Sequence, residues 1–165
     1  MSKRKTKHPD KPHITKCIFC GGVPLSETHI WPNWLRKVIP KQNNHFELLN
    51  KAVPIGPART DYSESLQKYK RDLFSKDPLL ACGACNGGWM KDIEDKVVYF
   101  LKQALKGELK RQLSRSEQAA LAAWIALITI LAEYEGNKIP TIYHNILSHI
   151  RQYATPTDNF NIFIG

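Results

Sequence analysis

The four cysteines of the chain occur as two closely spaced pairs, which are the strongest chemical signal in the sequence. The pairs are Cys17-Ile18-Phe19-Cys20 and Cys82-Gly83-Ala84-Cys85. A gap of two residues lets both thiolates of a pair point at one metal ion, while backbone amides donate hydrogen bonds to the sulfurs. Two such pairs complete a closed tetrahedral site. The sequence therefore predicts one structural Zn²⁺ held by all four thiolates.

Two disulfides and a redox-active thiol pair are the alternatives for these cysteines. Disulfides are typical of secreted proteins, but the basic N-terminus is followed by no apolar stretch, so we expect no signal peptide and a cytoplasmic location. A redox motif would account for one pair and leave the other unexplained. Zinc also has a clear physical role here. It would clamp the two pairs across the 61 residues that separate Cys20 from Cys82.

A histidine and an asparagine stand next to the two cysteine pairs. His29 lies nine residues after Cys20, and Asn86 directly follows Cys85. Histidine is the commonest general base near neutral pH. We expect Asn86 to head a helix, where backbone amides suit a phosphate. An ordinary structural histidine and a helix cap are the plain alternatives, and zinc would bring both residues together in either case.

The order of these motifs resembles the HNH endonucleases, a family of nucleases. The resemblance rests on Cys-x-x-Cys, then Ser-x-x-His-Ile-x-Pro around His29, then Cys-x-x-Cys-Asn-x-Gly-Trp-Met around Asn86. It implies a ββα-metal core, in which His29 activates water and Asn86 binds a catalytic divalent ion, Mg²⁺ or Mn²⁺. The implied activity is hydrolysis of DNA phosphodiester bonds, leaving 5′-phosphate and 3′-hydroxyl ends. Cleavage of RNA is a weaker alternative.

The chain departs from the family pattern at two points. Family members commonly carry a carboxylate directly before the histidine, where this chain has Thr28, with Glu27 one residue earlier. On a regular strand Glu27 and His29 share a face and Thr28 points away, so Glu27 would reach the ion only if the strand end bulges. The middle asparagine of the pattern is also not identifiable. The asparagines of the preceding segment are Asn43, Asn44 and Asn50.

The positive charge of the chain is concentrated in its first third. The net charge is +9, and residues 1–51 hold ten Lys and Arg against three acids. Such a basic segment favours a polyanionic partner, which is most often nucleic acid. With the HNH resemblance, the expected partner is DNA. A solvated tail that binds nothing has the same composition. Candidate phosphate contacts are Lys3, Arg4, Lys5, Lys7, Arg36, Lys37 and Arg71. A zinc module that binds nucleic acid without cutting it is therefore the rival function.

The pattern along the chain predicts an α+β fold in three parts. Residues 1–16 form a basic arm, 17–106 the zinc-clamped domain with an insert at 41–76, and 107–165 a helical module ending in a short strand. We expect helices at 32–39, 90–105, 114–134 and from Pro140, and short strands before His29, at 78–81 and in the insert. No apolar run reaches the roughly 20 residues of a membrane span. The four tryptophans are expected in the core.

Overall fold

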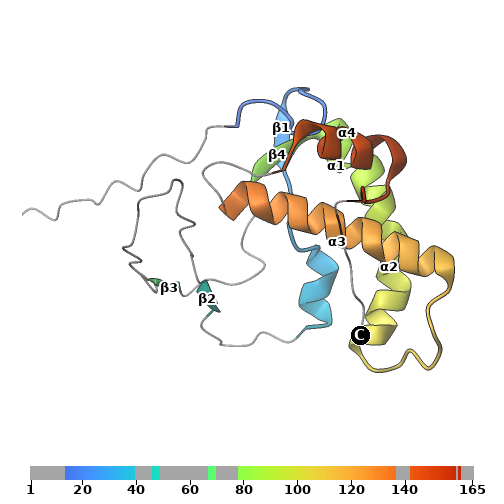
Figure 1. Cartoon of the computed structure of the whole chain (residues 1–165). Helices are drawn as coiled ribbons and strands as arrows, with labels where there is room; N and C mark the ends of the chain where they lie inside the picture. The colour runs from blue at the N-terminus through green and yellow to red at the C-terminus, as the bar shows by residue number, and fades with distance from the viewer. Residues whose placement is uncertain are drawn as a thin grey trace, which may run out of the picture.

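The computed structural model describes residues 14–39, 46–48, 67–69, 78–136, 142–158 and 160. Within them the fold is α+β, with two small sheets and several helices (Figure 1). The strands are β1 (Leu25–Glu27), β2 (Phe46–Leu48), β3 (Gln67–Tyr69) and β4 (Leu79–Cys82). The helices are the 3₁₀ helix η1 (Asn33–Lys37), α1 (Gly83–Asn86), α2 (Trp89–Leu105), α3 (Arg115–Gly136) and α4 (His144–Tyr153).

Each sheet is one antiparallel pair. β1 pairs with β4, far away in sequence, with Leu25 opposite Cys82 and Ser26 opposite Ala81. The register shifts between Ser26 and Glu27, so the end of β1 that leads to His29 is irregular. β2 pairs with β3, which confirms short strands in the insert. The rest of segment 41–76, with Asn43, Asn44, Asn50 and Arg71, lies outside the described residues.

Helix α2 shows the predicted three- and four-residue spacing of buried positions. Met90, Ile93, Val97 and Phe100 are buried, and this face packs against α3 (Figure 1). The helix ends at Leu105, two residues before Gly107, whose φ of +70° lies in the left-handed region that glycine tolerates. The helix predicted at 90–105 is confirmed.

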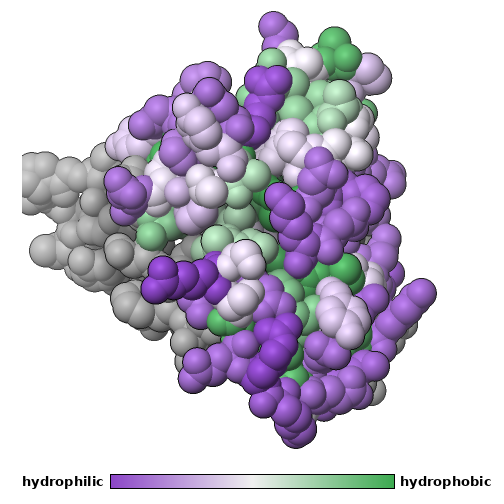
Figure 2. All heavy atoms as spheres, turned by 90° about the vertical axis from the view of Figure 1, so that its right-hand side faces the viewer, coloured by the Kyte–Doolittle hydropathy of each residue, from purple (hydrophilic) through white to green (hydrophobic). Residues whose placement is uncertain are grey.

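Helix α3 is apolar on most of its surface and forms the centre of the core. Its segment Arg115–Glu135 is long and apolar enough to cross a membrane by length and composition alone. Core helices of soluble proteins have the same composition, and α3 packs along α2 with Trp124 and Leu131 buried. The outer surface seen in Figure 2 is largely hydrophilic, with apolar atoms visible between the polar ones.

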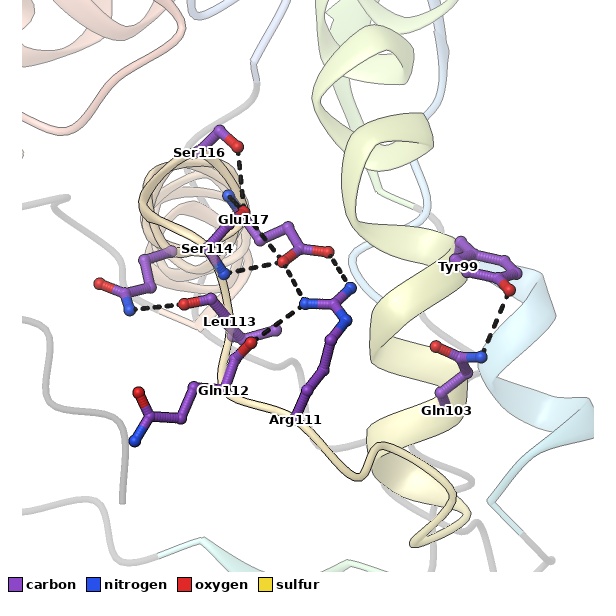
Figure 3. Close-up of polar contacts among 9 residues, drawn as sticks. Tyr99, Gln103, Arg111, Gln112, Leu113, Ser114, Ser116 and Glu117 are labelled. Atoms are coloured by element: carbon purple, nitrogen blue, oxygen red, sulfur yellow. Dashed lines mark hydrogen bonds and ion pairs between the residues drawn. The ribbon is translucent and has the colours of Figure 1, made fainter.

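The start of α3 is the capping box that the Ser114-x-x-Glu117 spacing predicts (Figure 3). The Glu117 backbone N–H donates to Ser114 Oγ at 3.3 Å, and the Ser114 backbone N–H donates to Glu117 Oε2 at 2.8 Å. Arg111 adds two 2.7 Å hydrogen bonds to the same carboxylate. The Arg111 guanidinium and the Ser114 N–H lower the pKa of Glu117 to about 2.

Removing this cap is expected to destabilise the protein modestly. Ser114→Ala leaves the Glu117 N–H without its acceptor, so we expect the free energy of unfolding at pH 7 to fall by about 1 kcal/mol. Ser114→Thr keeps a hydroxyl at the same place and is the matched control. Denaturant unfolding of the three proteins checks the prediction, which is wrong if alanine and threonine behave alike.

The C-terminal segment differs from the prediction in detail. The last helix begins at His144, and Pro140, expected to open it, lies outside the described residues. Ile146, Leu147 and Ile150 are buried as expected. Tyr143 and Tyr153, whose spacing from these residues predicts the same apolar face, are instead 73% and 58% exposed, because they lie at the two ends of a short helix. The expected final strand also lies outside the described residues, apart from Phe160.

The tryptophans do contribute to the core. Trp124 is buried and its ring lies 6.4 Å from that of Trp34. Trp89 meets Phe19 edge to face, with ring centroids 5.0 Å apart. Trp31, Trp34 and Trp89 are only half-buried and pack at the margin of the same cluster. The aromatic residues thus join the cysteine-rich end of the molecule to α2 and α3.

Candidate metal centre and the histidine beside it

The four cysteines converge on one point. Their Sγ atoms all lie within 4.8 Å of one another, with Cys20 Sγ 3.5 Å from Cys82 Sγ and 3.6 Å from Cys85 Sγ. Tetrahedral zinc with Zn–S distances of about 2.3 Å requires sulfurs about 3.8 Å apart. Three of the cysteines are buried and Cys20 is exposed. The cluster has the ligand type, number and spacing to hold a metal ion such as zinc.

A tight turn shapes the first cysteine pair. The Cys17 N–H donates to Gly22 O at 3.0 Å, and the Gly21 N–H donates to Cys17 O at 2.8 Å. The Gly22 N–H also donates to Cys20 Sγ at 3.3 Å, an amide–sulfur bond typical of zinc knuckles. A Cβ at Gly22 would lie 3.2 Å from that sulfur, so the close approach favours glycine.

The second pair forms where β4 runs into α1. Cys82 ends the strand and Cys85 lies in the one-turn helix that follows. The Cys85 backbone N–H lowers the pKa of Cys82 to about 7, whereas burial raises the pKa of Cys85 to about 12. The Ile18 N–H donates to Leu80 O at 3.0 Å, which joins the two knuckles through the backbone as well as through their sulfurs.

Asn86 reaches from α1 to the end of β1. Its Nδ2 donates to Glu27 O at 2.9 Å and to Ser26 Oγ at 3.3 Å. The segments that carry His29 and Asn86 therefore meet, as predicted for two cysteine pairs that share one metal ion. The prediction that Asn86 heads a helix is wrong, however. Asn86 ends α1, and Gly88 is the N-cap of α2, because the knuckle uses the first helical turn to place Cys85.

The side chains around His29 alternate between buried and exposed, as expected for a strand. Thr28 is fully buried, and its Oγ1 accepts the Ala81 N–H at 3.3 Å and donates to Ser26 O at 3.2 Å. Glu27 and His29 are exposed on the other side. The strand pairing is irregular between Ser26 and Glu27, but the residue without a partner there is Leu80 of β4, so β1 itself has no extra residue that would turn Glu27 toward an ion. Thr28 thus completes the strand pairing, and Glu27, two residues before His29, is the nearest carboxylate to it in sequence.

Two further polar residues lie near His29 that the sequence analysis did not single out. The Asn33 side chain contacts His29, with Nδ2 and Nε2 3.0 Å apart. Glu94 lies on α2 and is half-buried. Burial raises the pKa of Glu94, while the Trp34 side chain and the charge of His29 partly offset that effect. Asn33 follows His29 by four residues, a spacing at which side chains can meet, but only the packing of α2 brings Glu94 close.

The expected phosphate contacts are described only in part. Arg36 and Lys37 are exposed in the last turn of η1, four residues or fewer beyond Asn33. Their charges therefore lie on the element that follows His29. The remaining candidates lie outside the described residues: Lys3, Arg4, Lys5, Lys7 and Arg71.

Comparisons with known proteins add no family to this geometry. No protein-family model matches the chain, and neither a curated protein nor a solved structure matches it at a significant level. The cysteine cluster and the side chains that it brings together are therefore the features that bear on function.

Proposed function

We propose that this protein is a metal-dependent endonuclease of the ββα-metal type, which hydrolyses DNA phosphodiester bonds on a zinc-clamped scaffold. The observation that carries the proposal is the contact of Asn86 with the β1 end, at 2.9 Å from Glu27 O. This contact joins the two motif segments that the HNH resemblance assigns to one site. Exposed Arg36 and Lys37 supply positive charge nearby for a phosphate backbone.

The side chains beside His29 suit a hard divalent cation. Glu27 offers an exposed carboxylate. The Asn86 amide nitrogen is engaged with β1, so the carboxamide oxygen is the ligand atom that this residue presents. Carboxylate and amide oxygens are the donors that Mg²⁺ and Mn²⁺ prefer. Glu27 and Asn86 would hold the ion, which when bound would stabilise negative charge on the leaving oxygen.

The protein's own part in the reaction falls to His29. The neutral imidazole takes a proton from water, and the resulting hydroxide attacks the scissile phosphorus. The bond from phosphorus to the 3′ oxygen breaks, and the leaving oxygen takes a proton from solvent water, which gives a 3′-hydroxyl and a 5′-phosphate. The exposure of His29 fits this role, because both water and a DNA strand can approach the ring.

Plasmid cleavage tests the proposal directly. Purified zinc-loaded protein is incubated with supercoiled plasmid and Mg²⁺ or Mn²⁺, and reactions without either added ion provide the comparison, because a strong chelator would also remove the zinc. We expect nicked or linear products that a phosphatase and a ligase identify as carrying 5′-phosphates. Products with 3′-phosphates, or cleavage that persists without a divalent ion, would contradict the proposed chemistry.

A DNA-binding module without activity is the second candidate. The observation in its favour is Thr28, which is buried and hydrogen-bonded in the position directly before His29. The site therefore lacks the carboxylate commonly found there in HNH enzymes, and Glu27 must replace it. Intact plasmid together with binding that weakens steeply with salt would favour this second function.

Substituting Asn86 separates its ligand role from the fold. Asn86→Ala is expected to keep the cysteine cluster and to lower the cleavage rate about 10- to 100-fold, since the ion loses a ligand and the β1 end loses an anchor. Asn86→Asp keeps an oxygen ligand and should retain more activity than alanine. Zinc content and melting temperature are measured alongside the rate. Normal cleavage by Asn86→Ala would show that the ligand is wrongly assigned.

A further inference from the structure

The imidazole of His29 has a specific side-chain partner. Asn33 Nδ2 lies 3.0 Å from His29 Nε2. An amide N–H is a donor only, so in this arrangement Asn33 donates and Nε2 accepts. A neutral imidazole whose Nε2 accepts a hydrogen bond carries its proton on Nδ1. The contact therefore selects one of the two neutral tautomers of His29.

Both residues of this contact lie on backbone segments that neighbouring buried residues hold in place. His29 lies between Thr28 and Ile30, which are 0% and 3% exposed. Asn33 opens η1, where Leu35 is buried and its N–H donates to Pro32 O at 3.0 Å. The next residue, Trp34, packs against Trp124 of α3. The two polar side chains are exposed, but the backbone positions that bring them together are set by the core.

We propose that Asn33 is a positioning residue, which holds the His29 ring by Nε2 and keeps its proton on Nδ1. The catalytic part of this inference rests on the proposed nuclease function. In this tautomer Nε2 carries the basic lone pair, and its direction is defined by Asn33. Nε2 has a single lone pair, so the Asn33 N–H must leave it before Nε2 can take a proton from water. What Asn33 contributes to the rate is the tautomer in which the site meets its substrate, with the basic lone pair on Nε2.

Ring-nitrogen NMR of His29 tests the tautomer without any activity measurement. The zinc-loaded protein, labelled with ¹⁵N, is measured at about pH 8, where imidazoles are neutral. We expect the wild type to carry the proton on Nδ1, and Asn33→Ala to shift the population toward the Nε2–H tautomer. Asn33→Asp replaces the donor by an acceptor and should shift it further. Asn145→Ala, at an exposed asparagine of α4, should leave the His29 signals unchanged.

Each result bears on the proposal. A wild-type proton on Nε2, or a tautomer that Asn33→Ala and Asn33→Asp leave unaltered, overturns it. If plasmid cleavage is observed, Asn33→Ala should lower kcat by the factor by which the Nδ1–H population falls in the NMR measurement, with little change in KM. An unchanged kcat would overturn the catalytic part. If the wild type does not cleave DNA, the nuclease function fails, while the tautomer measurement still decides the role of Asn33.

Discussion

Replacing Cys82 by serine is expected to release zinc and unfold the cysteine-rich half of the protein. Structural zinc sites bind with about 10–16 kcal/mol at pH 7, which equals or exceeds the whole stability of a typical domain, about 5–15 kcal/mol. The regular elements that carry Cys82 and Cys85, and the strand that pairs with β4, are short. β1 and β4 have three and four residues, and α1 is a single turn. Such elements cannot hold their positions without the metal.

The measurement combines zinc content with circular dichroism and thermal melting. Cys82→Ser should bind no zinc at stoichiometric concentration and should lose the cooperative transition of the wild type. Ala84→Ser introduces the same hydroxyl at an exposed position between the ligands of the second pair, and it should retain both. If Cys82→Ser melts like the wild type, the cluster is not the clamp of this fold.

The zinc-dependent part of the stability should also depend on pH. Bound zinc requires thiolates, so the zinc-loaded state binds fewer protons than the metal-free chain. Without metal, the pKa of Cys82 is about 7 and that of Cys85 about 12. Zinc binding near neutral pH must therefore displace protons. The stabilisation is present at alkaline pH and is lost as the pH falls, which melting at a buffered free zinc concentration checks. A melting temperature that does not fall on acidification would contradict this.

Replacing His29 by alanine is expected to abolish plasmid cleavage while leaving the fold intact. Removing a general base typically costs about 10²- to 10⁴-fold in rate, or about 3–5 kcal/mol in the barrier. The His29 side chain is exposed, and it supplies none of the sulfurs of the cluster. Stability and zinc content should therefore stay close to those of the wild type.

The control for this variant is His144→Ala, at an exposed histidine on α4. Its cleavage rate should match the wild type, whereas His29→Ala should be inactive with either Mg²⁺ or Mn²⁺. DNA binding at several salt concentrations is measured for all three proteins, and it should not distinguish them, since a proton acceptor contributes little to phosphate affinity. Equal cleavage by His29→Ala and the wild type would exclude His29 as the base.

Much of the scaffold could be predicted because its signals are local. The paired cysteines, the capping box at Ser114 and the glycine stop at Gly107 each act over a few residues. The spacing of apolar residues placed α2 and α3 for the same reason. The alternation that buries Thr28 and exposes Glu27 and His29 also follows from a two-residue period. Local geometry determines these features, whatever the rest of the chain does.

Only the tertiary structure determined which polar side chains lie near His29. Glu94 is 65 positions further along the chain and comes close only because α2 packs against α1, the helix that carries Cys85. Asn86 was misplaced at a helix start, since the knuckle inserts a separate turn before α2. Local patterns set where each element begins and ends, but the neighbours of an exposed side chain depend on how those elements pack. That packing arises from burial spread over the whole core, so no single spacing reveals it.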